Sequence, residues 1–374
     1  MTAPTRRSFL AAAAAAATAT PWLRPGAHPA RPRSQPLKIL VLGGTGFLGP
    51  HFVRQALANG HTVTLFNRGR TNPGLFDDLE QLRGDRDKHD LEALKGREFD
   101  AIVDTSGYLP DHVRETAEIF KDTAAHYQFI STISVYGAFG GRPAELDENG
   151  ETAKISDEEA AKYTTIRASR RHYGAFKARC EAAAEAVMPG RVSNIRPGLI
   201  VGPGDVSDRF TWWPVRMDRG GEVLCPGDRD GHVQFIDVRD LASWMVHVLE
   251  QNVTGVYNAN GFHGRVSMIE MLSACKCATS TPVEMVWASE EFLQAEGVRP
   301  YMQMPVWIPR EGRSMIQNAK AVAQGLTFRP IGDTARDTLA WAKAERGAAP
   351  FERTGLAPER ERELIAKWRS QEKR

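Results

Sequence analysis

Tyr173 and Lys177 are the residues whose types and spacing most directly indicate chemistry. They begin an alanine-rich segment that predicts a helix, and side chains four residues apart lie on the same face of a helix. A phenol has a pKa of about 10, so it is a poor base at neutral pH, but a nearby ammonium group favours the phenolate. We therefore predict that Tyr173 exchanges a proton with a substrate hydroxyl. The alternative is a core tyrosine beside a lysine that reaches solvent.

Three hydroxyl side chains, Ser131, Thr132 and Ser134, end an apolar segment that starts at residue 127. Polar groups of this kind are unusual where a buried strand ends. Thr132 could hydrogen-bond the reacting oxygen and orient it, with Ser131 or Ser134 as a helper. Thr132 therefore joins the tyrosine and the lysine as a candidate catalytic residue.

A glycine-rich turn precedes these segments. The apolar run 38–42 breaks into glycines at 43, 46 and 49, and an amphipathic segment follows at 52–58. This order predicts a strand, a tight turn and a helix. Without a Cβ atom, Gly43 can take the turn, Gly46 can admit a pyrophosphate, and Gly49 can let the helix lie close to the strand. The helix N-terminus favours phosphate, so we predict a dinucleotide site; the alternative is a turn that binds no ligand.

From residue 37 onwards, apolar segments alternate with amphipathic ones. This alternation predicts an α/β fold with a doubly wound, mostly parallel sheet and helices on both faces. Ligands bind at the carboxyl ends of the strands in such sheets. The fourth predicted strand ends in Thr105, Ser106 and Gly107, whose small side chains permit close passage of a cofactor.

The end of the second predicted strand, residues 61–66, bears on the choice between NAD and NADP. An acid at this place binds the ribose 2′-OH of NAD, whereas an arginine can accept the 2′-phosphate of NADP. Here Asn67, Arg68 and Arg70 follow the strand and no acid does. The sequence leans towards NADP without excluding NAD, since Arg68 could also stack on adenine or face solvent. Asp85, at the next strand end, could meet the adenine or lie in a surface turn.

Five motifs together resemble the extended short-chain dehydrogenase/reductase family, which includes nucleotide-sugar epimerases and dehydratases. They occur in the order of that family and span residues 38–345. The motifs are Gly43-x-x-Gly46-x-x-Gly49, Ser131-Thr132-x-x-Val135-Tyr136-Gly137, Tyr173-x-x-x-Lys177, Arg196-Pro-Gly-Leu-Ile-Val-Gly-Pro203 and Phe235-Ile-Asp-Val-Arg-Asp-Leu241.

The resemblance implies a Rossmann-type sheet with a smaller C-terminal substrate-binding lobe. It also implies hydride exchange with a nicotinamide cofactor, with Lys177 holding the ribose hydroxyls and Pro197 packing against the carboxamide. The expected cofactor-binding residues are Gly43, Thr45, Gly46, Phe47, Leu48, Gly49, Asn67, Arg68, Asp85, Thr105, Ser106, Gly107 and Pro197.

One departure from the family concerns the substrate. Many nucleotide-sugar members carry an arginine shortly before the segment that matches residues 235–237, where it grips the diphosphate. Val233 occupies that place here. We therefore expect oxidation of a secondary alcohol of a sugar or related polyol rather than of a UDP-sugar. Two alternatives remain: net reduction of a phenolic ketone by NADPH, since residues 104–108 and 196–203 also resemble bacterial proteins labelled isoflavone reductases, and a non-catalytic binding protein like plastid RNA-binding relatives.

We expect residues 36–205 to form the dinucleotide-binding domain, with 230–258 returning to it. Residues 206–229 and 259–350 would form the substrate lobe, and 351–374 a charged tail that forms a solvated helix from residue 358 onwards.

Within the expected lobe, Arg209, Trp212, Trp213 and Arg216 suit a sugar or a flat phenolic ligand, although tryptophans on a helix more often belong to the core. Arg239 is a weak candidate for the substrate site. Its neighbours Asp237 and Asp240 are expected to form a turn and a helix start.

The first 35 residues predict an export signal and linker. Arg6 and Arg7 precede Phe9-Leu10, an alanine run and small residues, which resembles a twin-arginine signal; the run is too short to span a bilayer. The alternative is a disordered arginine-bearing extension. Because this route carries folded proteins, we expect a periplasmic or extracellular protein that keeps its cofactor through each turnover. The export machinery would then be a partner.

Composition is that of an ordinary globular protein, with 42% hydrophobic and 25% charged residues. Beyond residue 35 there are 43 basic and 46 acidic residues, so nothing indicates a nucleic acid as partner. The spacing of the four cysteines favours free packed thiols over a metal site, and we predict no metal. We expect a small-molecule substrate, no membrane span, and leave a homodimer open.

Overall fold

The computed structural model describes residues 35–139, 144–165, 171–347 and 349–372. The predicted export signal lies outside these residues. No helix in the described ranges is long and apolar enough to cross a membrane. Within the same ranges, no group of three or more His, Cys, Asp or Glu side chains is placed to hold a metal ion.

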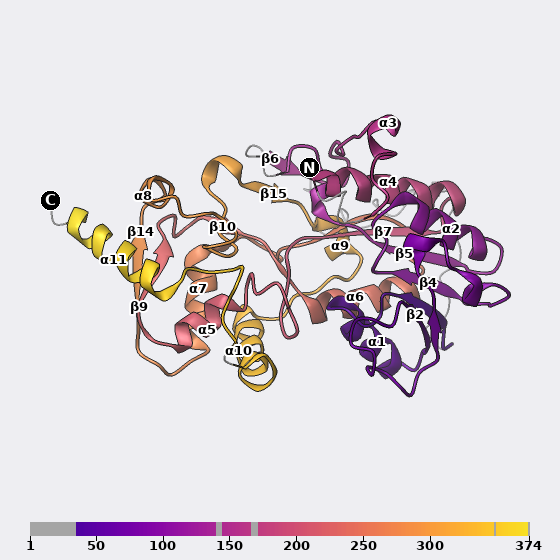
Figure 1. The fold of residues 1–374 in the computed structure, drawn as a ribbon, viewed down its shortest axis with the longest axis horizontal. Coiled ribbons are helices and arrows are strands. Elements are labelled where there is room, and N and C mark those ends of the chain that lie inside the picture. Colours follow the sequence, from indigo (N-terminus) through magenta and orange to yellow (C-terminus); the bar gives the residue numbers. More distant parts are fainter. Residues whose placement is uncertain (1–34, 140–143, 166–170, 348, 373–374) are drawn as a thin grey trace, which may run out of the picture. The chain divides into compact units, whose positions relative to one another are not determined.

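A parallel sheet of seven strands forms the first part of the fold (Figure 1). Its order is β12-β7-β5-β4-β1-β2-β3, and every neighbouring pair is parallel. The chain runs outward from β1 to β3 on one side and then crosses to β4 on the other, so the switch point lies between β1 and β4. The strands are β1 Lys38–Leu42, β2 Thr62–Asn67, β3 Gln81–Arg83, β4 Ala101–Asp104, β5 His126–Ile130, β7 Val192–Pro197 and β12 Gly255–Ala259.

Helices cover both faces of this sheet. On one face α1 (Leu48–Ala58) packs with α6 (Val238–Glu250), and on the other α2 (Pro110–Phe120) packs with α4 (Tyr173–Val187). Alternate residues of β1 serve the two faces: Ile39 belongs to the core under α1 and α6, and Leu40 to the core under α2 and α4. The predicted Rossmann-type fold is confirmed.

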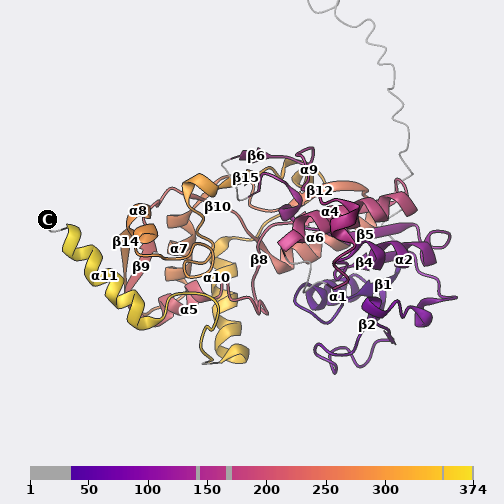
Figure 2. The ribbon, with the colours of Figure 1, turned by 45° about the horizontal axis from the view of Figure 1, so that its top comes forward.

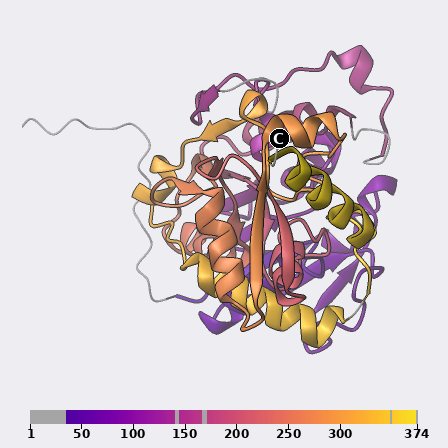
Figure 3. The same ribbon diagram turned by 90° about the vertical axis from the view of Figure 1, so that its left-hand side faces the viewer.

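Short strand pairs and helices make up the remainder. β9 and β14 run side by side (Figure 3), and α7 packs against α10 (Figure 2). The paired strands are β6 Ala144–Leu146 with β15 Ser314–Ile316, β8 Ile200–Val201 with β11 Ile236–Asp237, β9 Gly221–Pro226 with β14 Val283–Ala288, and β10 His232–Val233 with β13 Val266–Ser267. The helices are α3 Asp157–Ala160, α5 Trp212–Asp218, α7 Met268–Cys277, α8 Glu290–Ala295, α9 Ala319–Ala323, α10 Ile331–Trp341 and α11 Pro358–Glu372.

Shorter turns complete the described chain. The 3-10 turns are η1 Arg86–Lys88, η2 Glu92–Leu94, η3 Ile133–Val135 and η5 Arg310–Gly312, and η6 Ala342–Arg346 is a π-helical turn. All four cysteines are free; Cys180, Cys225 and Cys275 are buried and Cys277 is exposed.

The C-terminal segment forms the predicted helix α11, but the prediction that it is solvated is wrong. Leu364 and Ile365 are buried in the core around α5 and α7. Glu361 is also buried, pairs with Arg216 at 2.7 Å and accepts the Leu224 N–H at 3.1 Å. A few apolar residues spaced along one face were enough to anchor a helix that is otherwise densely charged.

Both predicted lobe tryptophans belong to the core. Trp212 and Trp213 are 1% and 0% exposed, and the indole N–H of Trp213 donates to the Pro305 carbonyl at 2.7 Å. They therefore hold α5 in place and do not meet a ligand.

Candidate active site

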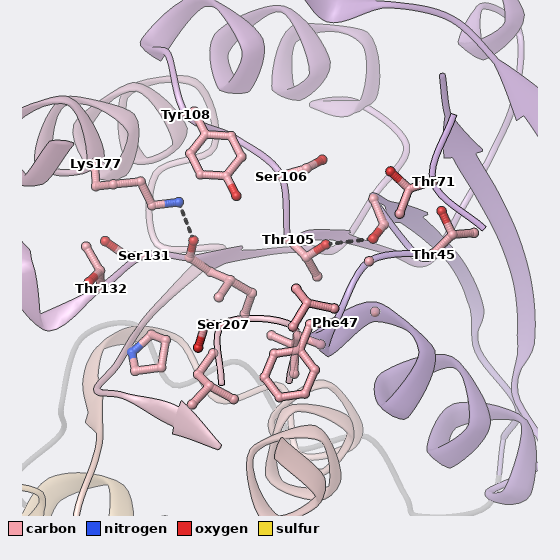
Figure 4. A pocket seen from close by; sticks show the side chains of 18 of the residues that line it. Thr45, Phe47, Thr71, Thr105, Ser106, Tyr108, Ser131, Thr132, Lys177 and Ser207 are labelled. Carbon is pink, nitrogen blue, oxygen red and sulfur yellow. Dashed lines mark hydrogen bonds between the residues drawn. The ribbon is translucent and has the colours of Figure 1, made fainter. Parts of the chain in front are cut away.

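A cavity of about 630 Å³ lies at the carboxyl ends of the central strands, as the switch point predicts. Figure 4 shows Lys177, Tyr108 and Ser131 gathered toward one end of this cavity and Thr45 and Thr71 toward the other. The predicted site residues that line it are Gly43, Thr45, Gly46, Phe47, Leu48, Gly49, Asn67, Arg68, Asp85, Thr105, Ser106, Thr132, Tyr173, Lys177 and Pro197.

The glycine turn is built as the sequence predicts. Gly43 has a φ of +88°, which other residues rarely adopt. A Cβ atom on Gly49 would lie 2.6 Å from the Gly43 carbonyl oxygen, so only glycine lets α1 begin this close to the turn. A Cβ on Gly46 would meet nothing closer than 4.0 Å. The backbone at Gly46 is thus open to the cavity, and the turn fits a pyrophosphate at the start of α1.

Asp85, which follows β3, lies beside the two arginines that follow β2. The Asp85 carboxylate lies 3.6 Å from the Arg70 guanidinium and 4.0 Å from that of Arg68, and Arg68 also lies 3.3 Å from Asp87. Arg68 and Arg70 are 49% and 67% exposed, so these are weak surface pairs that a ligand can displace. Asn67 accepts hydrogen bonds from Arg83 and from the Gly69 N–H.

Lys177 is buried at the inner end of the cavity. Its ammonium group donates to the carbonyls of Ile130 at 2.6 Å and Gly107 at 2.8 Å, and it lies over the rings of Phe129 and Tyr108. Burial lowers the Lys177 pKa to about 8. Gly107 does not line the cavity, contrary to the prediction; its backbone instead anchors the lysine.

Tyr173, which is 36% exposed, and Thr132 line the same cavity, and the Thr132 hydroxyl accepts the Ser134 N–H at 3.1 Å. Partial burial and the nearby Tyr108 raise the Tyr173 pKa to about 12, while the neighbouring Thr132 and Arg209 side chains act to lower it. The prediction that Lys177 and the positive nicotinamide ring together favour the phenolate concerns the protein with its cofactor bound, so it stays a prediction.

Ser131 is one of the two residues predicted to assist Thr132. Its side chain lines the cavity, its residue is 4% exposed, and its hydroxyl has no hydrogen-bond partner in the described part of the chain. Buried hydroxyls are nearly always paired, so this one is open to a ligand.

A buried ion pair that the sequence analysis missed supports the strand ends. Arg86 donates to both oxygens of Asp104 at 2.7 and 2.9 Å and to the Ser106 hydroxyl at 2.7 Å, and the Tyr127 hydroxyl donates to Asp104 at 2.9 Å. The arginine holds the pKa of Asp104 below its ordinary value. The available signal was a charged residue ending an otherwise apolar strand.

The other wall of the cavity comes from the segment before α5 and from Tyr301. Arg209 donates to the Tyr301 hydroxyl at 3.3 Å and to the Ser207 hydroxyl at 3.1 Å, and all three line the cavity. Of the four residues that the sequence analysis named in the lobe, Arg209 reaches the cavity, whereas Arg216 pairs with Glu361.

Arg239 was a wrong candidate for the substrate site. It pairs with Asp237 and Asp337 and does not line the cavity. Asp237 caps α6 by accepting the Arg239 N–H at 2.8 Å, which confirms the predicted helix start. Asp240 holds Arg329 at 2.8 Å.

Comparison with known proteins gives a family and a fold. A family model described as the NAD dependent epimerase/dehydratase family matches residues 39–259. The chain is 26% identical over 262 residues to the chloroplast stem-loop binding protein of 41 kDa b from Arabidopsis thaliana, covering 66% of this chain and 64% of that protein. It is 31% identical over 132 residues to the bifunctional UDP-glucose 4-epimerase and UDP-xylose 4-epimerase 1 from Pisum sativum, covering 27% of this chain and 38% of that protein.

The chain thus spans 64% and 38% of the lengths of these two curated relatives. Among solved structures, UDP-glucuronic acid 4-epimerase from Bacillus cereus in complex with NAD matches with a TM-score of 0.59 and 17% identity, covering 84% of this chain and 99% of that one. At this identity the likeness shows a shared fold and does not transfer a substrate.

Proposed function

Because this chain belongs to the NAD-dependent epimerase/dehydratase family, we propose that it is an NAD(P)-dependent oxidoreductase that transiently oxidises a secondary alcohol of a sugar or related polyol. The observation that carries the proposal is that Thr132, Tyr173 and Lys177 line the same cavity as the glycine turn. A proton-transfer group and a phosphate-binding turn in one cavity suit alcohol oxidation coupled to a dinucleotide.

The residues that would hold the cofactor follow from the geometry. The open backbone at Gly46 and the start of α1 would bind the pyrophosphate, Asp85 the adenosine, and Lys177 and Pro197 the nicotinamide riboside. The bound nicotinamide supplies the hydride acceptor and donor. Arg68 and Arg70 support a preference for NADP, since a 2′-phosphate would replace their weak pairing with Asp85.

Thr132 orients the substrate hydroxyl, and Tyr173 accepts its proton as the carbinol carbon loses hydride. With a pKa of about 12, the phenol is protonated at neutral pH in the chain alone. Proton acceptance therefore requires additional positive charge beside the phenol, which an oxidised nicotinamide carries. Return of the hydride to the opposite face of the carbonyl carbon, and of the proton to the carbonyl oxygen, would complete an epimerisation.

Tyr173→Phe tests this assignment. We expect turnover to fall 100- to 10,000-fold, as for loss of a general acid–base, with the co-purifying dinucleotide still bound. Tyr163→Phe is the matched control, because the Tyr163 hydroxyl bonds Glu159 and does not line the cavity. Mass spectrometry of the released dinucleotide measures the bound cofactor, and NMR of the sugar products measures turnover. Full activity of Tyr173→Phe would refute the mechanism, and consumption of added NADPH with a phenolic ketone would favour the reductase alternative.

A second candidate function is RNA binding, favoured by the Arabidopsis relative, whose name describes a stem-loop binding protein. The balance of 43 basic and 46 acidic residues beyond residue 35 argues against it. Tight binding of an RNA stem-loop at physiological salt by Tyr173→Phe protein would support this function over catalysis.

The cellular location is also part of the proposal: export through the twin-arginine route, with the dinucleotide already bound. Its support is the pair Arg6 and Arg7 before an alanine run. Replacing both arginines by lysine should keep the protein in the cytoplasm, as measured by fractionation. Normal export of that variant would contradict the proposal.

A further inference from the structure

A small side pocket adjoins the substrate end of the main cavity. Its volume is about 40 Å³, and it shares Ile133, Phe139, Leu199 and Tyr301 with the main cavity. Since one water needs roughly 10–15 Å³, the pocket has room for a hydroxyl or hydroxymethyl group and not for a nucleotide. Its wall is mostly apolar and includes Val233, the residue found in place of the diphosphate-binding arginine of nucleotide-sugar enzymes.

Asn260 brings an unpaired amide to this pocket. The residue is 0% exposed, and neither its side-chain nitrogen nor its side-chain oxygen has a hydrogen-bond partner in the described part of the chain. The fold makes room for this amide, because a Cβ on Gly198 would lie 1.8 Å from the Asn260 Oδ1 atom. Gly198 itself lines the main cavity, so the amide lies directly behind the cavity wall.

Asn258 lies two residues earlier, on β12, and its side-chain amide is hydrogen-bonded at both polar atoms. It is also 0% exposed, but its oxygen accepts the Tyr136 hydroxyl at 2.6 Å and its nitrogen donates to the Gln317 carbonyl at 3.0 Å. Both asparagines are buried, one on β12 and the other directly after it, but only the Asn258 side chain is hydrogen-bonded within the described part of the chain. Because buried amides are nearly always hydrogen-bonded, we infer that the Asn260 amide is paired by a bound group.

The charges at the side pocket exclude a strongly anionic occupant. Arg313 is held by Asp228 at 2.8 Å and donates twice to the Ile308 carbonyl. Burial lowers the pKa of His232, and Arg265 and Arg313 add to that effect, so the imidazole is neutral at pH 7. Gln234 exchanges two hydrogen bonds with the backbone of Ile316. Among the described residues that line the side pocket, no cation is free to bind a phosphate, whereas Arg209, whose partners are the hydroxyls of Ser207 and Tyr301, lines the main cavity.

We propose that the side pocket at Asn260 binds an uncharged hydroxyl-bearing group of a sugar or polyol substrate. This inference rests on the proposed function and names the substrate class of the same site. The amide can donate to and accept from a single hydroxyl, which is the recognition that a neutral sugar offers and a phosphate does not.

The first test compares the two asparagines without needing a ligand. In the purified protein with its cofactor, Asn258→Leu should lower the melting temperature by about 3–6 °C, because Tyr136 and Gln317 lose their partners. Asn260→Leu, of the same volume, should leave the melting temperature equal or higher. A decrease for Asn260→Leu as large as that for Asn258→Leu would show a structural amide and overturn the proposal.

The second test measures binding to the protein with its cofactor. The neutral probes are methyl β-D-glucopyranoside, methyl α-D-mannopyranoside and myo-inositol, followed by saturation-transfer NMR; the charged probe is UDP, followed by calorimetry. We expect at least one neutral probe to bind, with affinity about tenfold weaker in Asn260→Leu, and any UDP binding to be unchanged by that substitution. No binding of any neutral probe, or equal affinity of the neutral probe in the variant, would overturn the proposal. Failure of the proposed function would appear instead in the turnover of Tyr173→Phe.

Discussion

Replacing Lys177 by methionine should change how the stability of the protein depends on pH. The Lys177 ammonium is 2% exposed and its pKa is lowered to about 8, whereas a lysine in an unfolded chain has a pKa of about 10.4. Between these values the unfolded chain binds more protons than the native one, so the lysine makes stability rise with pH. Linkage gives a gain of about 1.3 kcal/mol in the free energy of unfolding between pH 7 and pH 9.

Urea unfolding followed by tryptophan fluorescence at pH 7, 8 and 9 measures this quantity in the full chain after removal of its dinucleotide. Other groups also titrate in this range, so the decisive value is the difference between wild type and Lys177→Met. That difference should grow by about 1.3 kcal/mol from pH 7 to pH 9. Lys154→Met is the control: Lys154 is exposed and paired with Glu151, and its pKa is raised, so its difference from wild type should be constant. If the difference in the free energy of unfolding between wild type and Lys177→Met does not change with pH, the lowered pKa of Lys177 is refuted.

Three further predictions concern the turn, the cofactor and the C-terminal helix. Gly49→Ala places a Cβ 2.6 Å from the turn backbone and should lose co-purified dinucleotide, whereas Gly332→Ala, with nothing within 4 Å, should keep it; equal cofactor content in both would contradict the close packing. Replacing Arg68 and Arg70 by alanine should weaken NADP binding about tenfold and leave NAD binding nearly unchanged in calorimetry, and equal losses would contradict the NADP preference. Glu361→Ala leaves its buried arginine partner unpaired and should cost about 3–5 kcal/mol of stability in urea, so an unchanged midpoint would restore the view of residues 351–374 as a solvated tail.

Much of the candidate site could be predicted from the sequence, because short local patterns set the glycine turn and the spacing of Tyr173 and Lys177. The glycines at 43, 46 and 49 are required by backbone geometry, and the spacing of Tyr173 and Lys177 places them on one helix turn. Strand ends in a parallel sheet meet at one edge, so the hydroxyl-rich end of β5 was expected to reach the same cavity. These inferences needed only the periodicity of the chain.

The misassigned residues were those whose role depends on partners far along the chain. Arg239 was taken for a ligand residue because the sequence does not show that Asp337 lies beside it. The solvated-helix prediction for residues 351–374 failed because Glu361 meets Arg216, which lies 145 positions earlier. The two backbone carbonyls that hold the Lys177 ammonium group were not predicted, because backbone acceptors leave no trace in side-chain patterns.

The sequence by itself determined the parallel sheet, the glycine turn and the identity of the candidate catalytic side chains, because each depends on residues within one or two elements. Only the tertiary structure determines the pKa values of these side chains and the residues that form the substrate end of the cavity. Burial sets the pKa values of Tyr173 and Lys177, and burial is a property of the whole packed chain. The contrast between Asn258, which is fully paired, and Asn260, which is unpaired, likewise arises from contacts across the fold, since the two residues are of one type on one strand end.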